Sequence, residues 1–399
     1  MRVLYVSYDG MTDPLGQAQV LPYLLGLSQL GHAISLLSFE KPGRAADRPA
    51  LERRLAALGI DWRPLSYHKR PRSLATAADL AVGLRELERV QRAHRPDLVH
   101  CRSYIAGALG LAGKRRHGWR LVFDMRGFWI DERLEGGALG PGMLCQALRA
   151  LERSLLRNAD AIVSLSQAGI AEMRRWPYVD PAIARRMHHI PTCTDTRRFE
   201  EAYRMRLSRT TDPDRPVLLY LGSFGLRHPP ELTLSFLREA GRFLPGARFE
   251  LLVADGKEAI ASGLQATDLP ADRVRLDQVA PADVPGRLAS ADLAFYFVRP
   301  TYSALASAPT KLAELLAAGI PVVCGPGVGD VDRILADHDV GRIADPRSGA
   351  AVRAALEEVL AMLARDRQGL AERCRRAAAL HFDLSVGVRK YDEIYRSLA

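Results

Sequence analysis

The chain has 399 residues, of which 48% are hydrophobic and 26% are charged. This composition is typical of a folded globular protein, and the length predicts two domains rather than a single core. The composition does not suggest a long disordered segment. No apolar stretch is long enough to span a bilayer.

The formal net charge is +10, and basic residues outnumber acidic ones only within residues 1–205. Such an excess indicates an anionic partner, which would be a phosphorylated lipid, a membrane surface or nucleic acid. An arginine-rich solvated surface without any partner is the alternative. Nucleic acid is disfavoured, because the sequence contains no helix-turn-helix, zinc-finger or RNP pattern.

The N-terminal segment and the cysteines bear on the cellular compartment. Residues 2–8 are apolar over too few positions to form the hydrophobic region of a signal peptide, and Asp9 ends them. The five cysteines are far apart and form no C-x-x-C pair, which is typical of reduced thiols and argues against a structural zinc site. We therefore expect a cytoplasmic protein, with contact to the inner face of the membrane left open.

The first elements predict a parallel sheet. Residues 3–8 form a short apolar strand, a loop containing Gly16 follows, and an amphipathic helix is expected over residues 17–30 with Gly31 at its end. Residues 34–39 form the next strand, which completes a βαβ unit. The alternation continues, with helices expected at 47–58, 73–94, 105–117 and 142–157 and strands at 97–101, 120–124 and 160–165.

A turn-rich, basic stretch over residues 191–215 interrupts this pattern. Strands are then expected at 217–222, 248–253, 273–276, 292–298, 320–324 and 340–343, with helices between them. The pattern predicts an α/β protein of two doubly wound Rossmann-like domains with a ligand-binding cleft between them. The expected divisions are residues 1–205, residues 206–380, and a C-terminal helix over 381–399 that packs back on the first domain.

Residues 307–319 predict a helix with unusual chemistry. Ser307 or Ala308 is the expected N-cap, and Gly319 the expected end. Lys311 lies in the first turn, where a cation opposes the helix dipole, and this placement is explained if an anion binds there. Glu314 could then accept hydrogen bonds from ribose hydroxyls. The alternative is a surface ion pair between Lys311 and Glu314.

The segment Pro309-Thr310-Lys311-Leu312-Ala313-Glu314, followed by Ala318-Gly319-Ile320-Pro321-Val322-Val323, resembles the donor-binding helix of retaining glycosyltransferases of family 4, which have the GT-B fold. Other similar pieces occur in the family's order along essentially the whole chain. They are Tyr5-Val6-Ser7 with Gly16 and Gly31-His32, residues 159–166, residues 190–199, and Leu219-Tyr220-Leu221-Gly222-Ser223.

The resemblance implies that the second domain binds a nucleotide-diphosphate sugar and the first domain an acceptor. It also implies that no metal is needed, since cations and helix N-termini neutralise the leaving diphosphate. The expected donor-binding residues are Gly16, Gly222, Ser223, Arg227, Ser307, Thr310, Lys311 and Glu314. For Gly16 the physical reason is that a small residue ahead of a helix lets backbone amides approach phosphate or sugar oxygens, although a plain turn glycine is the alternative. For Arg227 the alternative is a solvent-exposed side chain.

Three positions depart from the family pattern. The first of two glutamates eight residues apart is Ala306 here, and the usual arginine after the strand-end glycine is Ser223. Residues 121–132 contain no histidine at the place of the family's catalytic one. The candidate catalytic residues are therefore Asp124, Arg126 and Lys311, with a structural ion-pair cluster of Asp124, Arg126, Asp131 and Arg133 as the alternative.

Two basic features of the first domain suit an anionic lipid or a lipid-linked diphosphate. Lys69, Arg70 and Arg72 belong to a basic, aromatic-tipped loop, and Arg149, Arg153 and Arg157 form a stripe along a helix. A solvated surface is the alternative for both.

Together these observations predict a retaining glycosyltransferase that moves a hexose or hexosamine from a UDP- or GDP-sugar to a glycan or lipid-linked acceptor. The expected pathway is surface polysaccharide or glycolipid biosynthesis. A sugar-nucleotide epimerase or hydrolase of the same fold is one alternative. A non-catalytic sugar-nucleotide-binding protein is the other.

Overall fold

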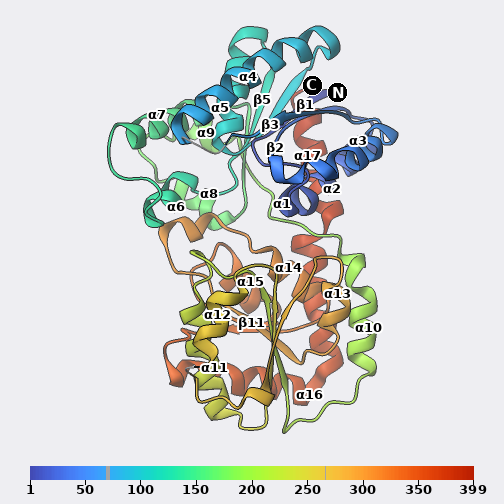
Figure 1. Ribbon diagram of the computed structural model, residues 1–399, viewed down its shortest axis with the longest axis vertical. Coiled ribbons are helices and arrows are strands. Elements are labelled where there is room, and N and C mark those ends of the chain that lie inside the picture. The colour runs from blue at the N-terminus through green and yellow to red at the C-terminus, as the bar shows by residue number, and fades with distance from the viewer. Residues whose placement is uncertain (69–71, 266) are drawn as a thin grey trace. The chain divides into compact units, whose positions relative to one another are not determined.

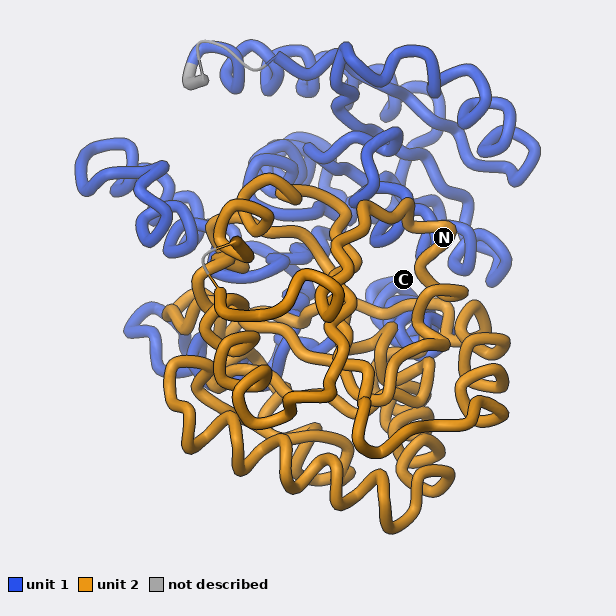
Figure 2. The backbone as a smooth tube through the Cα atoms, turned by 60° about the horizontal axis from the view of Figure 1, so that its bottom comes forward, with its two compact units in different colours: residues 1–191, 384–399 blue, residues 192–383 orange. Residues whose placement is uncertain are grey.

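The computed structural model describes residues 1–68, 72–265 and 267–399. The chain forms two compact units (Figure 2): unit 1 is Met1–Pro191 with Leu384–Ala399, and unit 2 is Thr192–Asp383. The first unit thus ends at Pro191, whereas the sequence placed the division at residue 205. No helix in the described ranges is long and apolar enough to cross a membrane.

Unit 1 contains a seven-stranded parallel sheet in the order β3-β2-β1-β4-β5-β6-β7. The strand order reverses between β1 and β4, so ligands are expected beyond the carboxyl ends of these two strands. The strands are β1 (Arg2–Ser7), β2 (Ala33–Glu40), β3 (Asp61–Ser66), β4 (Leu98–Arg102), β5 (Arg120–Asp124), β6 (Ala161–Ser164) and β7 (Met187–His189).

The helices of unit 1 follow the strands in alternation (Figure 1). Helices α4, α5 and α7 pack in a row, with α5 also lying on β1, β4 and β5. The C-terminal helix α17 packs on α2. The bounds are α1 (Pro14–Gln19), α2 (Leu21–Gln29), η1 (Pro42–Asp47), α3 (Arg48–Ala57), α4 (Arg72–His94), α5 (Ser103–His117), α6 (Trp129–Glu135), α7 (Met143–Asn158), α8 (Gln167–Met173), α9 (Pro181–Ala184) and α17 (Leu384–Ser397).

The expected helix over residues 17–30 is wrong in two respects. Helix α1 already begins at Pro14, and Val20, with φ −120° and ψ −61°, separates it from α2. Proline at the start of each helix explains the two beginnings, because its fixed φ suits the first turn. The sequence also missed β3 and β7, which are the two edge strands of the sheet.

Helix α17 is attached to the sheet of unit 1 by a buried polar network. Tyr391 Oη donates to Asp124 Oδ2 at 3.1 Å, and Tyr395 Oη lies 2.6 Å from His100 Nδ1. His32 Nε2 lies 2.7 Å from Asp392 Oδ1. The last helix therefore completes the core of the first unit, although unit 2 precedes it in the chain.

Unit 2 contains a six-stranded parallel sheet in the order β10-β9-β8-β11-β12-β13. Its order reverses between β8 and β11, as in other doubly wound domains. The strands are β8 (Val217–Gly222), β9 (Arg248–Val253), β10 (Val274–Gln278), β11 (Leu293–Tyr296), β12 (Val322–Cys324) and β13 (Gly341–Ile343). The predicted strands of this half are confirmed, with differences of a few residues at their ends.

The helices of unit 2 include the long α16, which packs beside α11 and α14 (Figure 1). They are η2 (Thr196–Phe199), α10 (Glu200–Ser208), α11 (Pro230–Phe243), α12 (Lys257–Leu264), η3 (Ala271–Arg273), α13 (Val284–Leu288), η4 (Tyr302–Ala306), α14 (Thr310–Ala317), α15 (Val331–His338) and α16 (Gly349–Phe382).

The prediction of turns throughout residues 191–215 is wrong, because α10 occupies Glu200–Ser208. Phe199, Ala202 and Arg206 from this region are fully buried against unit 2. Tertiary burial rather than local pattern therefore determines this helix.

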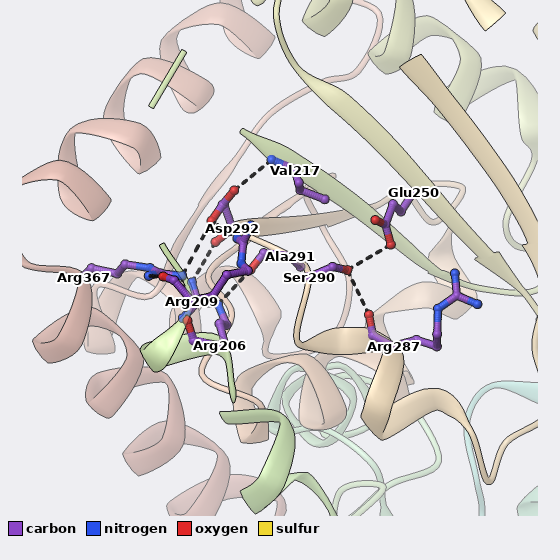
Figure 3. A network of polar contacts seen from close by, with 9 residues as sticks. All are labelled: Arg206, Arg209, Val217, Glu250, Arg287, Ser290, Ala291, Asp292 and Arg367. Carbon is purple, nitrogen blue, oxygen red and sulfur yellow. Dashed lines mark hydrogen bonds and ion pairs between the residues drawn. The ribbon is translucent and has the colours of Figure 1, made fainter. Parts of the chain in front are cut away.

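Arg206 belongs to a polar network at the amino ends of β8 and β11 (Figure 3). It donates from Nε to Ala291 O at 2.9 Å and from Nη2 to Asp292 O at 2.8 Å. Asp292 also pairs with Arg209 and accepts the Val217 amide at 2.9 Å. Arg367 of α16 donates to the carbonyl oxygens of Arg206 and Arg209. The network fastens α10 to the sheet and to α16.

Candidate functional site

The candidate site of unit 2 lies where its strand order reverses. Strand β8 ends at Gly222, with φ +140°, a conformation that side-chain-bearing residues rarely adopt. A Cβ atom at this position would lie 2.4 Å from Lys311 Nζ. Glycine is thus required here for both its backbone conformation and the space that Lys311 occupies.

Helix α14 positions Lys311 next to this strand end. Pro309, not Ser307 or Ala308, is the N-cap, because Ser307 ends the preceding η4 turn. Leu312, Leu315 and Leu316 of this helix are fully buried and fix its orientation on the core of unit 2. Gly319 follows the helix with φ +75°, as expected of a residue just beyond a helix end.

The side chain of Lys311 is only 9% exposed. Its Nζ has no hydrogen-bond partner within the described ranges. The ammonium lies 5.2 Å from the ring centre of Tyr220 and 5.3 Å from that of Tyr296, so two aromatic rings are its near neighbours. Cation–π contacts stabilise such a charge only in part. The alternative of a surface ion pair with Glu314 is therefore wrong.

Burial changes the acid–base behaviour of this group and its neighbours. Loss of hydration lowers the pKa of Lys311 to about 7, against a small opposing effect of Glu314. Burial also raises the pKa of Glu314 to about 7, with Arg198 and Lys311 acting in the opposite direction. His228 has a pKa of about 3, because burial and then the nearby Lys311 charge disfavour protonation. The ammonium of Lys311 therefore lacks a fully ionised carboxylate beside it.

The neighbouring loops bring further predicted donor residues together. Arg227 Nη2 donates to Ser307 Oγ at 2.6 Å, so the loop after β8 contacts the segment that leads into α14. Arg227 is partly buried, which removes the alternative of a fully exposed side chain. The carbonyl of Ser223 accepts from Tyr220 Oη at 3.1 Å, and Thr310 is the first residue of α14.

Unit 2 therefore places Gly222, Ser223, Arg227, Ser307, Thr310, Lys311 and Glu314 in one region at the carboxyl ends of β8 and β11. A buried ammonium without a partner is costly unless a negative group approaches it. The arrangement is suited to bind an anion with two or more phosphate oxygens. The sequence did not reveal the parts of Tyr220, Tyr296 and His228, since aromatic residues at strand ends are equally typical of a core.

Asp124 and Arg126 lie at the end of β5 in unit 1. The Asp124 side chain is 2% exposed, and its Oδ2 is 3.8 Å from Arg126 Nη1 and 3.8 Å from His100 Nε2. Burial disfavours ionisation of Asp124, but Arg126, His100 and Arg102 outweigh it and lower the pKa of the carboxyl group. Asp124 is thus a buried carboxylate whose negative charge balances the guanidinium group of Arg126.

The proposed structural cluster of four is only partly present. Asp124 and Arg126 do form an ion pair, whereas Asp131 pairs with Arg149 of α7, and Arg133 lies over the Trp129 ring at 4.1 Å. His100 was missed from the sequence. A histidine in the middle of an otherwise apolar strand was the available signal.

Gly16 belongs to unit 1 and lies within α1, not ahead of the helix. A Cβ atom there would approach the carbonyl oxygen of Gly10 to 2.2 Å and the Cα of Met11 to 2.7 Å. Close packing of the helix on the preceding turn therefore requires glycine. This physical reason differs from the expected approach to phosphate.

The basic features of unit 1 are only partly described. Lys69 and Arg70 lie outside the described residues, and Arg72 is the first residue of α4. In the arginine stripe of α7, Arg149 turns to Asp131 and Glu152, while Arg153 lies near the Tyr178 ring. Arg149 is therefore engaged within the unit, and only Arg153 and Arg157 are exposed.

Comparison with known proteins supports the same interpretation of the fold. Residues 16–193 match the family model "Glycosyl transferase 4-like domain". Solved structures similar over essentially the whole chain include sucrose-phosphate synthase from Thermosynechococcus elongatus, with 17% identity, a TM-score of 0.75, and coverage of 100% of this chain and 99% of that one. The chain has the GT-B fold.

Two further structures share this fold. Anabaena HepE, solved with UDP and glucose, has 14% identity and a TM-score of 0.69 over 100% of both chains. WaaG, a glycosyltransferase involved in lipopolysaccharide biosynthesis, has 16% identity and a TM-score of 0.65 over 98% of this chain and 99% of that one. No curated protein sequence is significantly similar to this chain. In the described ranges, no three His, Cys, Asp or Glu side chains gather as metal ligands would.

Proposed function

We propose that this protein is a glycosyltransferase that moves a hexose or hexosamine from a UDP- or GDP-sugar to a hydroxyl group of a glycan or lipid-linked acceptor. Unit 2 would bind the donor and unit 1 the acceptor. The similarity of residues 16–193 to a glycosyltransferase domain and the GT-B fold support this proposal. Complexes of HepE with UDP and with UDP-glucose show that a protein of this fold can bind such a donor.

The buried ammonium of Lys311 is the observation that carries the proposal. It lies where the strand order of the sheet reverses, beside the strand end at Gly222, and its Nζ has no hydrogen-bond partner in the described part of the chain. A diphosphate placed there would supply the missing negative charge. Arg227, linked to Ser307, adds a guanidinium that can hold phosphate oxygens from the adjacent loop.

Glu314 is assigned to the ribose of the donor. It lies one turn after Lys311 on α14 and is largely buried, and its pKa of about 7 makes it half protonated near neutral pH. Either form can bind the two hydroxyls of a ribose, because the carboxylate accepts from both and the protonated group accepts from one and donates to the other. Thr310 and Ser307 would add hydroxyl contacts at the start of the helix.

The chemical role of the site is to stabilise the leaving group. In the transfer, the anomeric carbon exchanges its bond to the β-phosphate oxygen for a bond to the acceptor oxygen, whose proton leaves with the diphosphate. Negative charge grows on the β-phosphate as the bond breaks. Lys311 and Arg227 would stabilise that charge in a preorganised site without a metal ion.

Retention of configuration follows from the family resemblance. Transfer would then occur from the same face of the sugar, without a covalent intermediate on the protein. NMR of the first-formed product tests this assignment, because the one-bond coupling constant between C1 and H1 reports the anomeric configuration for every hexose. A product with inverted configuration would overturn it.

We place the activity in surface polysaccharide or glycolipid biosynthesis, at the cytoplasmic face of a membrane. The fold likeness to WaaG and the basic excess within residues 1–205 support this assignment. Liposome sedimentation of the Lys69→Glu, Arg70→Glu double variant tests the membrane part. Unchanged binding to anionic vesicles, with unchanged salt dependence, would contradict it.

The proposal as a whole is tested by incubating the protein with UDP- and GDP-sugars and a panel of lipid-diphosphate and glycoside acceptors. Transfer is detected as a mass increase of the acceptor by one sugar residue. Wild-type protein should form product, and Lys311→Met should lose at least about 100-fold in kcat/KM, as for other groups that stabilise developing charge. Donor turnover without any acceptor product would identify an epimerase or hydrolase instead. Binding without turnover would identify a sugar-nucleotide-binding protein.

A further inference from the structure

The strand order of unit 1 places a row of polar residues at its own switch point. Ser7 of β1 pairs in register with Arg102 of β4, and Arg102 pairs with Asp124 of β5. Asp9 is the second residue after β1. These residues therefore meet at the carboxyl ends of the central strands, where a doubly wound sheet binds its ligand.

Side chains at this edge form a continuous chain of charged hydrogen bonds. Arg102 Nε donates to Asp9 Oδ2 at 3.1 Å, and Arg102 Nη2 donates to Gln19 Oε1 at 3.0 Å. The same Gln19 oxygen accepts from Arg126 Nη2 at 3.0 Å. Gln19 of α1 thus joins two guanidinium groups, and Arg102 holds one oxygen of the Asp9 carboxylate in a fixed position.

Asp9 is the accessible member of this chain. Its side chain is 46% exposed, whereas Arg102 is 4% and Arg126 10% exposed. Oδ2 is used by Arg102, and Oδ1 accepts no hydrogen bond from the described part of the protein. A fixed carboxylate with one oxygen available is suited to accept a hydrogen bond from a ligand hydroxyl.

The backbone beside the row is strained. Ser103, the first residue after β4, has φ +67°. Arg126, the second residue after β5, has φ +57°. Positive φ is unfavourable for residues with a side chain, and such residues gather at binding sites when the surroundings hold them in place. Two adjacent strands therefore end in turns that direct their side chains to the same edge.

The adjoining loop is closed to phosphate. Glu40 is fully buried, and its carboxylate accepts from the backbone amides of Met11 at 2.7 Å and Thr12 at 3.0 Å. It also accepts from Thr12 Oγ1 at 2.6 Å. These amides of the β1–α1 loop are the donors that would otherwise hold a ligand anion. The protein's own carboxylate occupies them.

The charges at the edge also favour an uncharged ligand. The two guanidinium groups of Arg102 and Arg126 are balanced by the carboxylates of Asp9 and Asp124. An incoming anion would gain no net attraction, and it would meet the exposed Asp9 first.

We propose that Asp9, held by Arg102 and Gln19, binds a hydroxyl group of an uncharged sugar ring at the switch point of unit 1. This inference rests on the proposed function, and it makes the ring that enters unit 1 the acceptor. Any phosphate of a lipid-linked acceptor lies away from this crevice. Asp9 then contacts the ring, while Arg102 and Gln19 are positioning residues.

Saturation-transfer NMR tests the inference on the full chain, with and without saturating UDP. The probes are the methyl glycosides of glucose, galactose, mannose and N-acetylglucosamine, with the hexose 1-phosphates as anionic counterparts. At least one methyl glycoside should bind wild-type protein. Asp9→Asn should weaken that binding roughly tenfold or more, since a hydrogen bond to a charged group is lost. Gln19→Leu should weaken it while leaving every charge in place.

Controls separate this site from folding and from the donor site. Asp47→Asn replaces a carboxylate of the same unit that is 56% exposed, and it should leave glycoside binding unchanged. UDP affinity and the melting temperature should be the same in wild-type and Asp9→Asn proteins, because Asp9 lies in the other unit and is half exposed. A melting temperature lowered by Asp9→Asn would identify a structural role and overturn the assignment.

Three other results would also overturn it: equal glycoside binding by wild-type and Asp9→Asn proteins, preference for hexose 1-phosphates, or no glycoside binding at all. Failure of both UDP and GDP to bind would instead overturn the proposed donor site. The glycoside comparison would still decide the role of Asp9, because it is also made without UDP.

Discussion

The buried side chain of Lys311 lowers the stability of the ligand-free protein. Its pKa of about 7 in the folded protein is below the ordinary value of 10.5, because burial disfavours the charged form. Below pH 7 the ammonium is charged in both states, but it is buried in the folded protein and fully hydrated in the unfolded chain, so its desolvation lowers the free energy of unfolding. The cost is therefore fully present below pH 7, and it disappears as the pH rises from 7 to 10.5.

Replacement of Lys311 by methionine should stabilise the ligand-free protein. At pH 6 we expect the free energy of unfolding to rise by on the order of 2 kcal/mol, because methionine fills the same space without a charge. The gain should shrink between pH 7 and 10.5. Denaturant unfolding of wild-type and Lys311→Met proteins at pH 6 and pH 10 measures it. A variant less stable than wild type at pH 6 would show that the ammonium is already well paired.

At this scale, sequence reasoning reached part of the site. The placement of Lys311 against the helix dipole marked it as unusual, and the structure shows that its side chain is buried. Its burial between Tyr220 and Tyr296 was not predictable, since it depends on β8 and β11 lying side by side, which periodicity does not reveal. Gly16 was singled out for its small size, but the contact that requires it is with Gly10.

Helix α10 shows how a buried polar network attaches a helix to a sheet, and Asp292 is the acidic residue of that network. Asp292 is 8% exposed and pairs with Arg209, and it accepts the amide of Val217 at the start of β8 (Figure 3). Asp292→Ala should lower the free energy of unfolding by about 1–3 kcal/mol, because the partly buried Arg209 and the buried amide of Val217 lose their acceptor. Chemical denaturation of the wild-type and Asp292→Ala proteins, with the unfolding of unit 2 as the signal, measures this change.

The matched control is Asp277→Ala, which removes a carboxylate that is 29% exposed and pairs with Arg275 and Arg287. It should cost less than about 1 kcal/mol, as expected of pairs near the surface. Equal losses in the two variants would contradict the special role of Asp292.

The same helix marks the limit of prediction for single elements. Most helices and strands followed from alternating apolar patterns and turn residues. The basic stretch containing α10 has no clear apolar face, because one of its buried residues is Arg206, whose guanidinium donates to backbone carbonyls. A buried arginine in a helix cannot be recognised from the sequence without knowing these acceptors. The edge strands β3 and β7 were missed because few of their residues are fully buried.

At the scale of the whole molecule, unit 1 is built from two separate segments of the chain, and unit 2 is built from the segment between them. The chain leaves unit 1 at Pro191, completes unit 2, and returns with α17 at Leu384 (Figure 2). Alternating strands and helices predicted both sheets. The end of unit 1 at residue 191 was not predictable, because residues 192–208 join unit 2 through tertiary contacts, among them the burial of Phe199 and the backbone hydrogen bonds of Arg206.

Removal of residues 384–399 should damage unit 1 selectively. Tyr391, Tyr395 and Asp392 of α17 supply partners to Asp124, His100 and His32, which would be left buried without them. Hydrogen exchange measured by mass spectrometry should become faster in β1, β4 and α2 of the truncated protein. Peptides from β8, β11 and α14 should be unchanged. Faster exchange throughout unit 2 would contradict the independence of the two units.

The central claim is that Lys311 binds the diphosphate of a nucleotide sugar, and nucleotide titration by calorimetry tests it most directly. UDP or GDP should bind wild-type protein with uptake of a proton, and affinity should fall as the pH rises from 7 to 9, because Lys311 must be charged in the complex. Lys311→Met should bind at least about tenfold more weakly, without that pH dependence. Lys41→Met, an exposed lysine of unit 1, should bind as wild type does. Nucleotide binding by Lys311→Met that equals wild type at every pH would contradict the account.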